Sequence, residues 1–142
     1  MEALIILEYF LKEIRVLAEQ LVPIWNSGLT KKQVQDIERI QKVALKIILA
    51  EKYENYLNAY KIFNLETMVT RRLQLSTNFA VRLFKSDRCN KFFTLAKKNS
   101  SRRHGNRLVV ENMSRTKRCY NAPHNYLSRL VNLNAEKIRK TL

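Results

Sequence analysis

Apolar residues recur every three or four positions through most of the first 85 residues, which is the period of helices with one buried face. The first such stretch covers residues 2–22, and Pro23 is predicted to end it. Its main stripe consists of Leu4, Leu7, Leu11, Ile14, Leu17, Ala18 and Leu21, and it is widened by Ile5, Ile6, Tyr9 and Phe10. A helix that is apolar over so much of its circumference is buried on more than one side or packs against another surface.

A second helix is predicted to begin at Lys31, because Thr30 and Gln33 have the spacing of a capping box. The residues predicted to face the core are Val34, Ile37, Ile40, Gln41, Ala44, Ile47 and Ile48. The basic residues predicted to face mostly water are Arg39, Lys42 and Lys46.

A short third helix is predicted over residues 53–63, and a fourth from about Glu66 to Lys85, with Asn64 or Thr67 as its cap. The fourth helix is predicted to bury Val69, Leu73, Phe79, Ala80, Leu83 and Phe84. The arginines predicted to lie on its outer surface are Arg71, Arg72 and Arg82.

The helical period fails after Lys85. Residues 92–95 support at most two helical turns, residues 108–110 at most a short strand, and residues 126–131 a last turn or two. The chain has only two glycines and two prolines, which favours long helices over a many-stranded sheet. The sequence therefore predicts an all-α fold: about four helices in an irregular bundle over residues 1–85, and a basic, largely irregular segment over residues 86–142.

Charge is the strongest compositional anomaly, with a formal net charge of +15 over 142 residues. Residues 85–142 hold 15 lysines and arginines against three acids, net +12, so the excess is concentrated in the C-terminal part. Such an excess repels itself unless an anionic partner screens it, and nucleic acid is the commonest such partner. A solvated basic tail, or one that contacts an acidic protein or a membrane surface, is the alternative.

Basic residues are interleaved with aromatic and amide residues in this part, a combination suited to binding phosphates and unstacked bases. The candidate nucleic-acid-binding residues are Lys97, Lys98, Arg102, Arg103, Arg107, Arg115, Lys117, Arg118 and Arg129. The neighbouring rings are Phe92, Tyr120 and Tyr126. For Phe92 and Tyr126 the more common role of such a ring is packing in a small secondary core, and not stacking on a base.

Catalytic chemistry is not predicted. Two-metal phosphoryl transfer needs closely spaced carboxylates, yet the only aspartates, Asp36 and Asp87, lie far apart in the sequence. Glycine-rich phosphate loops and Gly-x-Ser-x-Gly elbows are absent. The candidate zinc ligands contain no Cys-x-x-Cys pair, which disfavours a metal site, and no cofactor is predicted. These ligands are Cys89, His104, Cys119 and His124.

No membrane-spanning segment is predicted, because five charged side chains interrupt the apolar run over residues 3–21, and a membrane is not the expected partner. An acid at position 2 replaces the cationic start of a signal peptide. An intracellular location, nuclear or cytoplasmic, is therefore expected.

Ten stretches of the chain follow one another in a characteristic order: Ile14–Trp25, Asn26–Gln33, Asp36–Ile48, Asn64–Thr67, Arg71–Arg72, Asn78–Ala80, Ser101–Arg103, Arg115–Arg118, Asn121 and Tyr126–Leu130. In order and spacing they resemble the region that follows the catalytic palm in the reverse transcriptases of non-LTR retrotransposons. The resemblance covers roughly residues 8–133. Ala122, His124 and Asn125 depart from that family's usual pattern.

The resemblance implies a non-catalytic, thumb-like part of a larger enzyme whose palm is missing from this sequence, with the basic residues on phosphates of RNA or DNA. The first helix would then pack against an upstream polymerase domain. The alternative is a helical protein-interaction module that uses the apolar N-terminal helix to bind a partner or a second copy, as Ile5, Ile6, Tyr9 and Phe10 suggest.

Overall fold

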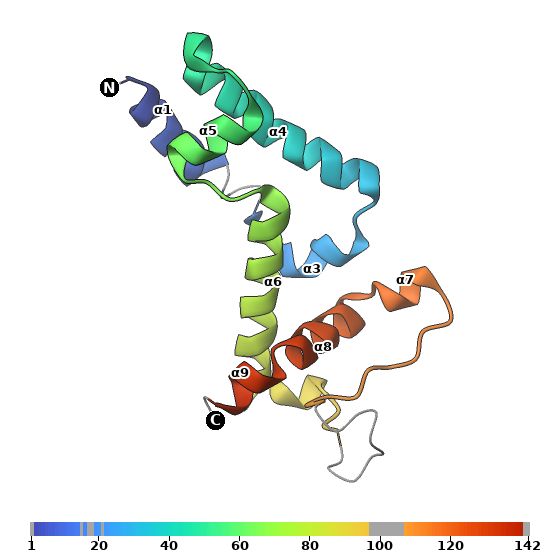
Figure 1. The fold of residues 1–142 in the computed structure, drawn as a ribbon. Helices are drawn as coiled ribbons and strands as arrows, with labels where there is room; N and C mark the ends of the chain where they lie inside the picture. The colour runs from blue at the N-terminus through green and yellow to red at the C-terminus, as the bar shows by residue number, and fades with distance from the viewer. Residues whose placement is uncertain (1, 15, 17–18, 21, 97–106, 141–142) are drawn as a thin grey trace. The chain divides into compact units, whose positions relative to one another are not determined.

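The computed structural model describes residues 2–14, 16, 19–20, 22–96 and 107–140, and these residues are mostly helical. The elements in chain order are α1 (Glu2–Tyr9), the π-helical turn η1 (Phe10–Ile14), α3 (Val22–Trp25), η2 (Asn26–Gly28), α4 (Lys31–Leu49), η3 (Ala50–Lys52), α5 (Tyr56–Phe63), α6 (Met68–Lys85), η4 (Asn90–Phe92), α7 (Lys117–Tyr120), α8 (Pro123–Leu133) and α9 (Ala135–Arg139) (Figure 1). Within these ranges the only β-pairing is an isolated antiparallel bridge between Leu95 and Val109. The predicted all-α class is confirmed, with more helices than the four expected.

The contacts divide the chain into two compact units. The first consists of residues 1–22 and 29–73, and the second of residues 23–28 and 74–142. The division falls inside α6, and not at the predicted boundary of residues 85 and 86. The reason is that Ala80, Val81 and Phe84 on the last turns of α6 pack with residues that come later in the chain.

The N-terminal stretch is interrupted earlier than its pattern predicts. Helix α1 ends at Tyr9, and Pro23 lies inside α3, so the prediction that Pro23 ends the first helix is wrong. Proline is tolerated in the first turn of a helix because its missing N–H has no intrahelical acceptor there. On α1, Leu7 is buried as predicted, whereas Ile5 and Tyr9 are both 63% exposed.

The core of the first unit lies where α1, α4 and α5 come together (Figure 1). Its buried residues are Leu7, Phe10, Leu45, Ile48, Leu49, Ala59 and Tyr60. The predicted core face of α4 is correct at Gln41 and Ile48 but wrong at Ile40 and Ile47, which are 53% and 68% exposed. Both sides of α4 carry apolar residues, and the position of α1 and α5 decides which side is buried.

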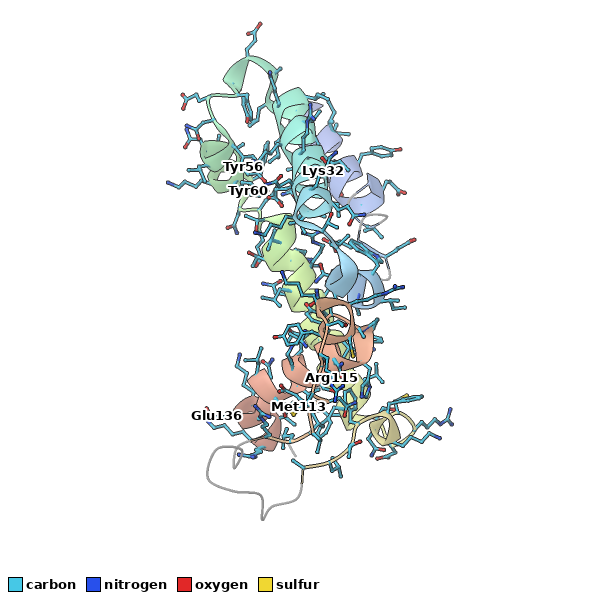
Figure 2. The ribbon with its side chains drawn as sticks, turned by 90° about the vertical axis from the view of Figure 1, so that its right-hand side faces the viewer. Lys32, Tyr56, Tyr60, Met113, Arg115 and Glu136 are labelled. Carbon is cyan, nitrogen blue, oxygen red and sulfur yellow. The ribbon has the colours of Figure 1, made fainter. Side chains whose placement is uncertain are left out.

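A polar cluster joins α5 to α4 within this unit. The hydroxyls of Tyr56 and Tyr60 donate hydrogen bonds to the same Glu38 oxygen, Oε1, at 2.5 and 3.0 Å, and the two rings lie close together on α5 (Figure 2). The ammonium of Lys42 lies 4.5 Å from the centroid of the Tyr56 ring. Lys42 therefore has a role inside the fold and is not simply a solvated cation.

The predicted start of the second helix is confirmed. Thr30 Oγ1 accepts a hydrogen bond from the Gln33 N–H at 3.3 Å, and the Gln33 side chain accepts one from the Thr30 N–H at 2.9 Å. This reciprocal pair satisfies two backbone donors that have no intrahelical acceptor.

We expect Thr30→Ala to lower the free energy of unfolding of the first unit by about 1 kcal/mol, because it removes one partner of the capping box. Thermal unfolding followed by circular dichroism measures the loss. Thr30→Ser keeps the hydroxyl and should stay close to the wild type, and an equal loss in both variants would contradict the capping role.

Helix α6 buries the predicted face only in its last turns, where Ala80 is buried and Leu83 and Phe84 pack against a core. Earlier in the helix another face is buried. Met68, Arg72, Ser76 and Ala80, spaced by four, are buried. The residues predicted to be buried but found exposed are Val69, Leu73 and Phe79. Arg72, predicted to lie outside, is only 1% exposed, and its Nε donates to the Met68 carbonyl at 3.1 Å. The buried positions of this helix, 68, 72 and 76, lie one residue before the predicted positions 69 and 73, so Arg72 falls on the buried face. The apolar pattern alone does not indicate this shift.

The second unit has a core of its own, built from Ala80, Phe93, Val109, Leu130, Val131 and Ile138. Residues 117–139 are almost entirely helical, so the prediction of a mostly irregular C-terminal third is wrong over this range. Pro123 occupies the first turn of α8, where its fixed φ favours a helix start. The basic segment is thus partly a folded, packed structure and not only a solvated tail.

Candidate nucleic-acid interface

The nine predicted cations fall into three groups. Lys97, Lys98, Arg102 and Arg103 lie outside the described residues. Four others are exposed, and no acidic residue of the described chain forms an ion pair with them: Arg107, Arg115, Lys117 and Arg118. The ninth, Arg129 on α8, is half-buried and makes contacts within the fold.

Three of the exposed cations lie within four consecutive residues at the start of α7. Thr116 caps this short helix, its Oγ1 accepting from the Cys119 N–H at 3.2 Å. Arg115 follows the fully exposed Met113 in the stretch that leads into α7 (Figure 2). Lys117 and Arg118 are the first two residues of the helix. Neighbouring cations without acidic partners produce a local positive potential that an anion would neutralise.

The buried side chain of Asn125 holds this segment against α8. Its Nδ2 donates to the Cys119 carbonyl at 2.8 Å and to Ser114 Oγ at 3.2 Å. Both ends of residues 114–119 are therefore tied to the same point of the second unit. The cations project from an anchored segment, although α7 itself has only four residues.

Arg129 joins the end of α7 to α8 through an aromatic ring. Its Nη1 donates to the Tyr120 carbonyl at 2.6 Å, and its guanidinium carbon lies 3.7 Å from the centroid of the Tyr120 ring. The Tyr126 ring is farther away, at 5.9 Å. Tyr120 remains 52% exposed, whereas Tyr126 is half-buried and its hydroxyl accepts from Asn26 Nδ2 at 3.1 Å. Arg129 therefore supports a ring, in addition to contributing charge.

The residues on either side of positions 97–106 are held side by side. The Ala96 N–H donates to the Leu108 carbonyl at 3.0 Å, and the Val110 N–H donates to the Thr94 carbonyl at 2.7 Å. The predicted short strand over residues 108–110 is present only as this single bridge. Arg107 directly precedes it.

The Asn132 side chain on α8 forms hydrogen bonds with backbone groups of Leu108 and Val109, as a neighbouring strand would. Its Oδ1 accepts from the N–H groups of Leu108 and Val109 at 2.9 and 3.1 Å. Its Nδ2 donates to the Val109 carbonyl at 3.0 Å and to Glu111 Oε1 at 2.8 Å. All the hydrogen bonds that an amide side chain normally makes are thus used, and they anchor the bridge to α8.

The three candidate metal ligands that the structure describes, Cys89, Cys119 and His124, do not form a group that could hold a metal ion. His104 lies outside the described residues, and His124 stacks on Phe93 with ring centroids 6.4 Å apart. In the described ranges, no group of three or more His, Cys, Asp or Glu residues is arranged to hold a metal ion.

None of the helices in the described part of the chain is long and apolar enough to cross a membrane.

Comparisons with protein families, with curated proteins and with solved structures find no match for this chain.

Sequence reasoning missed the two asparagines that organise this region, Asn125 and Asn132. Their roles depend on backbone groups that lie 6 to 24 residues away in the chain, and no local spacing marks such a contact. The full length of α8 could have been predicted from the sequence. Pro123 followed by apolar residues at positions 126, 127, 130 and 131 is the pattern of a helix start and one buried face.

Proposed function

We propose that this chain is a non-catalytic nucleic-acid-binding region, similar to the C-terminal, thumb-like part of a non-LTR retrotransposon reverse transcriptase. The observation that carries the proposal is the set of exposed cations without acidic partners among the described residues, in a part of the chain with net charge +12. Phosphate oxygens of RNA or DNA are the anions that such a surface binds best, because each contact releases condensed counterions.

Binding of this kind is weakly dependent on sequence. A helix reads bases when it lies in the major groove and aims several side chains at base edges. Helix α7 has four residues, and its cations belong to consecutive positions that point in different directions. Contacts to the backbone therefore dominate over contacts to bases.

A second candidate function is protein interaction through the N-terminal helix, with a polymerase domain or a second copy as the partner. It is favoured by the exposure of Ile5, Ile6 and Tyr9, which are 63%, 48% and 63% exposed on one short helix. Apolar side chains grouped in this way on a surface are typical of interaction sites.

A salt titration distinguishes the two functions. If about six phosphates are contacted, log K for nucleic acid should fall against log salt with a slope of about −4 to −5. Association through α1 should instead persist or strengthen as salt rises, because it buries apolar surface. Fluorescence anisotropy with a labelled oligonucleotide measures the first, and light scattering of the protein alone measures the second. Nucleic-acid affinity that is insensitive to salt would overturn the proposed function.

A further inference from the structure

The Tyr120 ring is covered on one face by Arg129, and the residue is still exposed. The Arg129 guanidinium lies 3.7 Å from the ring centroid, which is the distance of a stacked contact. Tyr120 is nevertheless 52% exposed. Because Arg129 lies over one face of the ring, we assign this exposure to the opposite face and the ring edges.

The ring is also held in place. Arg129 donates to the carbonyl of Tyr120 itself at 2.6 Å, so the same guanidinium contacts both the backbone and the ring of this residue. The Tyr120 N–H donates to the Thr116 carbonyl at 2.9 Å. A ring ordered in advance loses little conformational freedom when a ligand stacks on it.

The open ring lies in the same short segment as the cations. Arg115, Lys117 and Arg118 precede Tyr120 by two to five positions and have no acidic partner among the described residues. Cations for a backbone and an open ring beside them are the two components of a single-strand binding surface.

We propose that Tyr120 is a stacking platform for an unpaired base, and that the segment of residues 115–120 therefore prefers single-stranded to duplex nucleic acid. This inference rests on the proposed nucleic-acid function and names the form of the ligand. In a duplex, both faces of each internal base are already stacked on neighbours. A ring can be inserted there only by unstacking a base step, which is unfavourable.

The test compares a labelled single-stranded oligonucleotide with the duplex of the same sequence, using the full chain. Tyr120→Leu removes the ring and should weaken single-strand binding about 10-fold, since the stacking contact with one base is lost. Duplex affinity should stay within about twofold, because phosphate contacts remain. Lys117→Gln keeps the ring but removes a charge, and it should weaken the binding of both the single strand and the duplex.

Two variants with an aromatic ring at position 120 test whether the loss of binding comes from misfolding. Tyr120→Phe should bind the single strand like the wild type, and Tyr120→Trp should bind it at least as tightly. A fluorescent adenine analogue in the single strand should be quenched by the wild type, Tyr120→Phe and Tyr120→Trp, but not by Tyr120→Leu.

The inference is overturned on its own if Lys117→Gln weakens binding while Tyr120→Leu changes neither form or changes both equally. If the wild type binds neither form, the proposed function fails as well. These outcomes separate a stacking platform from a surface tyrosine that only packs on Arg129.

Discussion

Replacing Arg107, Arg115, Lys117 and Arg118 together by glutamine should weaken binding to nucleic acid roughly 100- to 1,000-fold near 0.1 M salt. The slope of log K against log salt should flatten by about 3, since each lost phosphate contact contributes about 0.7–0.9. Both single-stranded and duplex forms should be affected, because the phosphate contact is common to both. Fluorescence anisotropy over a series of salt concentrations provides both quantities.

The fold should tolerate this change. All four side chains are exposed, and none forms an ion pair with a described residue. Glutamine keeps a long polar side chain and a helix propensity close to that of lysine and arginine. The circular dichroism spectrum and thermal midpoint should therefore stay close to those of the wild type, so that lost affinity reflects lost charge.

The matched control removes four charges from the first unit by replacing Lys31, Lys32, Arg39 and Lys46 with glutamine. These side chains are exposed on α4. Lys42 is left unchanged because it lies over the Tyr56 ring. The control should lower affinity far less than the C-terminal set, through the general field alone. If it lowers affinity more, the binding surface lies on α4 and the assignment to the C-terminal part is wrong.

Asn132→Ala should lower the free energy of unfolding of the second unit by about 2–4 kcal/mol, because it removes four hydrogen bonds and leaves backbone groups unpaired. Val109 is fully buried, so its N–H and carbonyl cannot bind water instead. In the bridge, the Leu108 carbonyl and the Val110 N–H form hydrogen bonds with residues 94–96. The N–H and carbonyl of Val109 form theirs with the Asn132 side chain.

The chain's single tryptophan, Trp25, belongs to the second unit, so its fluorescence in a urea titration follows the unfolding of that unit. Hydrogen exchange of the Leu108 and Val109 amides should accelerate in the same variant. Asn134→Ala is the control, since among the described residues the Asn134 side chain makes only a local hydrogen bond, with the Leu130 carbonyl at 2.9 Å. Equal destabilisation by the two changes would show that Asn132 does not anchor the bridge.

The candidate site was predictable only in its composition. The excess of cations in the C-terminal part is visible from counting residues, and four of the nine predicted cations are exposed in the described chain. The role of Arg129 was not predictable, because it depends on a ring nine positions earlier. The anchoring of residues 114–119 by Asn125 likewise depends on a contact across the turn between α7 and α8.

By itself, the sequence determined the all-α class and the N-cap of α4, and it limited the N-cap of α6 to Asn64 or Thr67. These features depend on neighbours within about four positions, such as Thr30 with Gln33 and Thr67 with Thr70. Tertiary structure alone decided which face of each helix is buried. Helices α4 and α6 carry apolar residues on more than one side, and burial of Leu45 with exposure of Ile47, or of Arg72 with exposure of Leu73, follows from the elements packed against them. Periodicity restricts a helix to a few possible faces, and contacts between residues distant in the chain select among them because they determine where apolar area is removed from water.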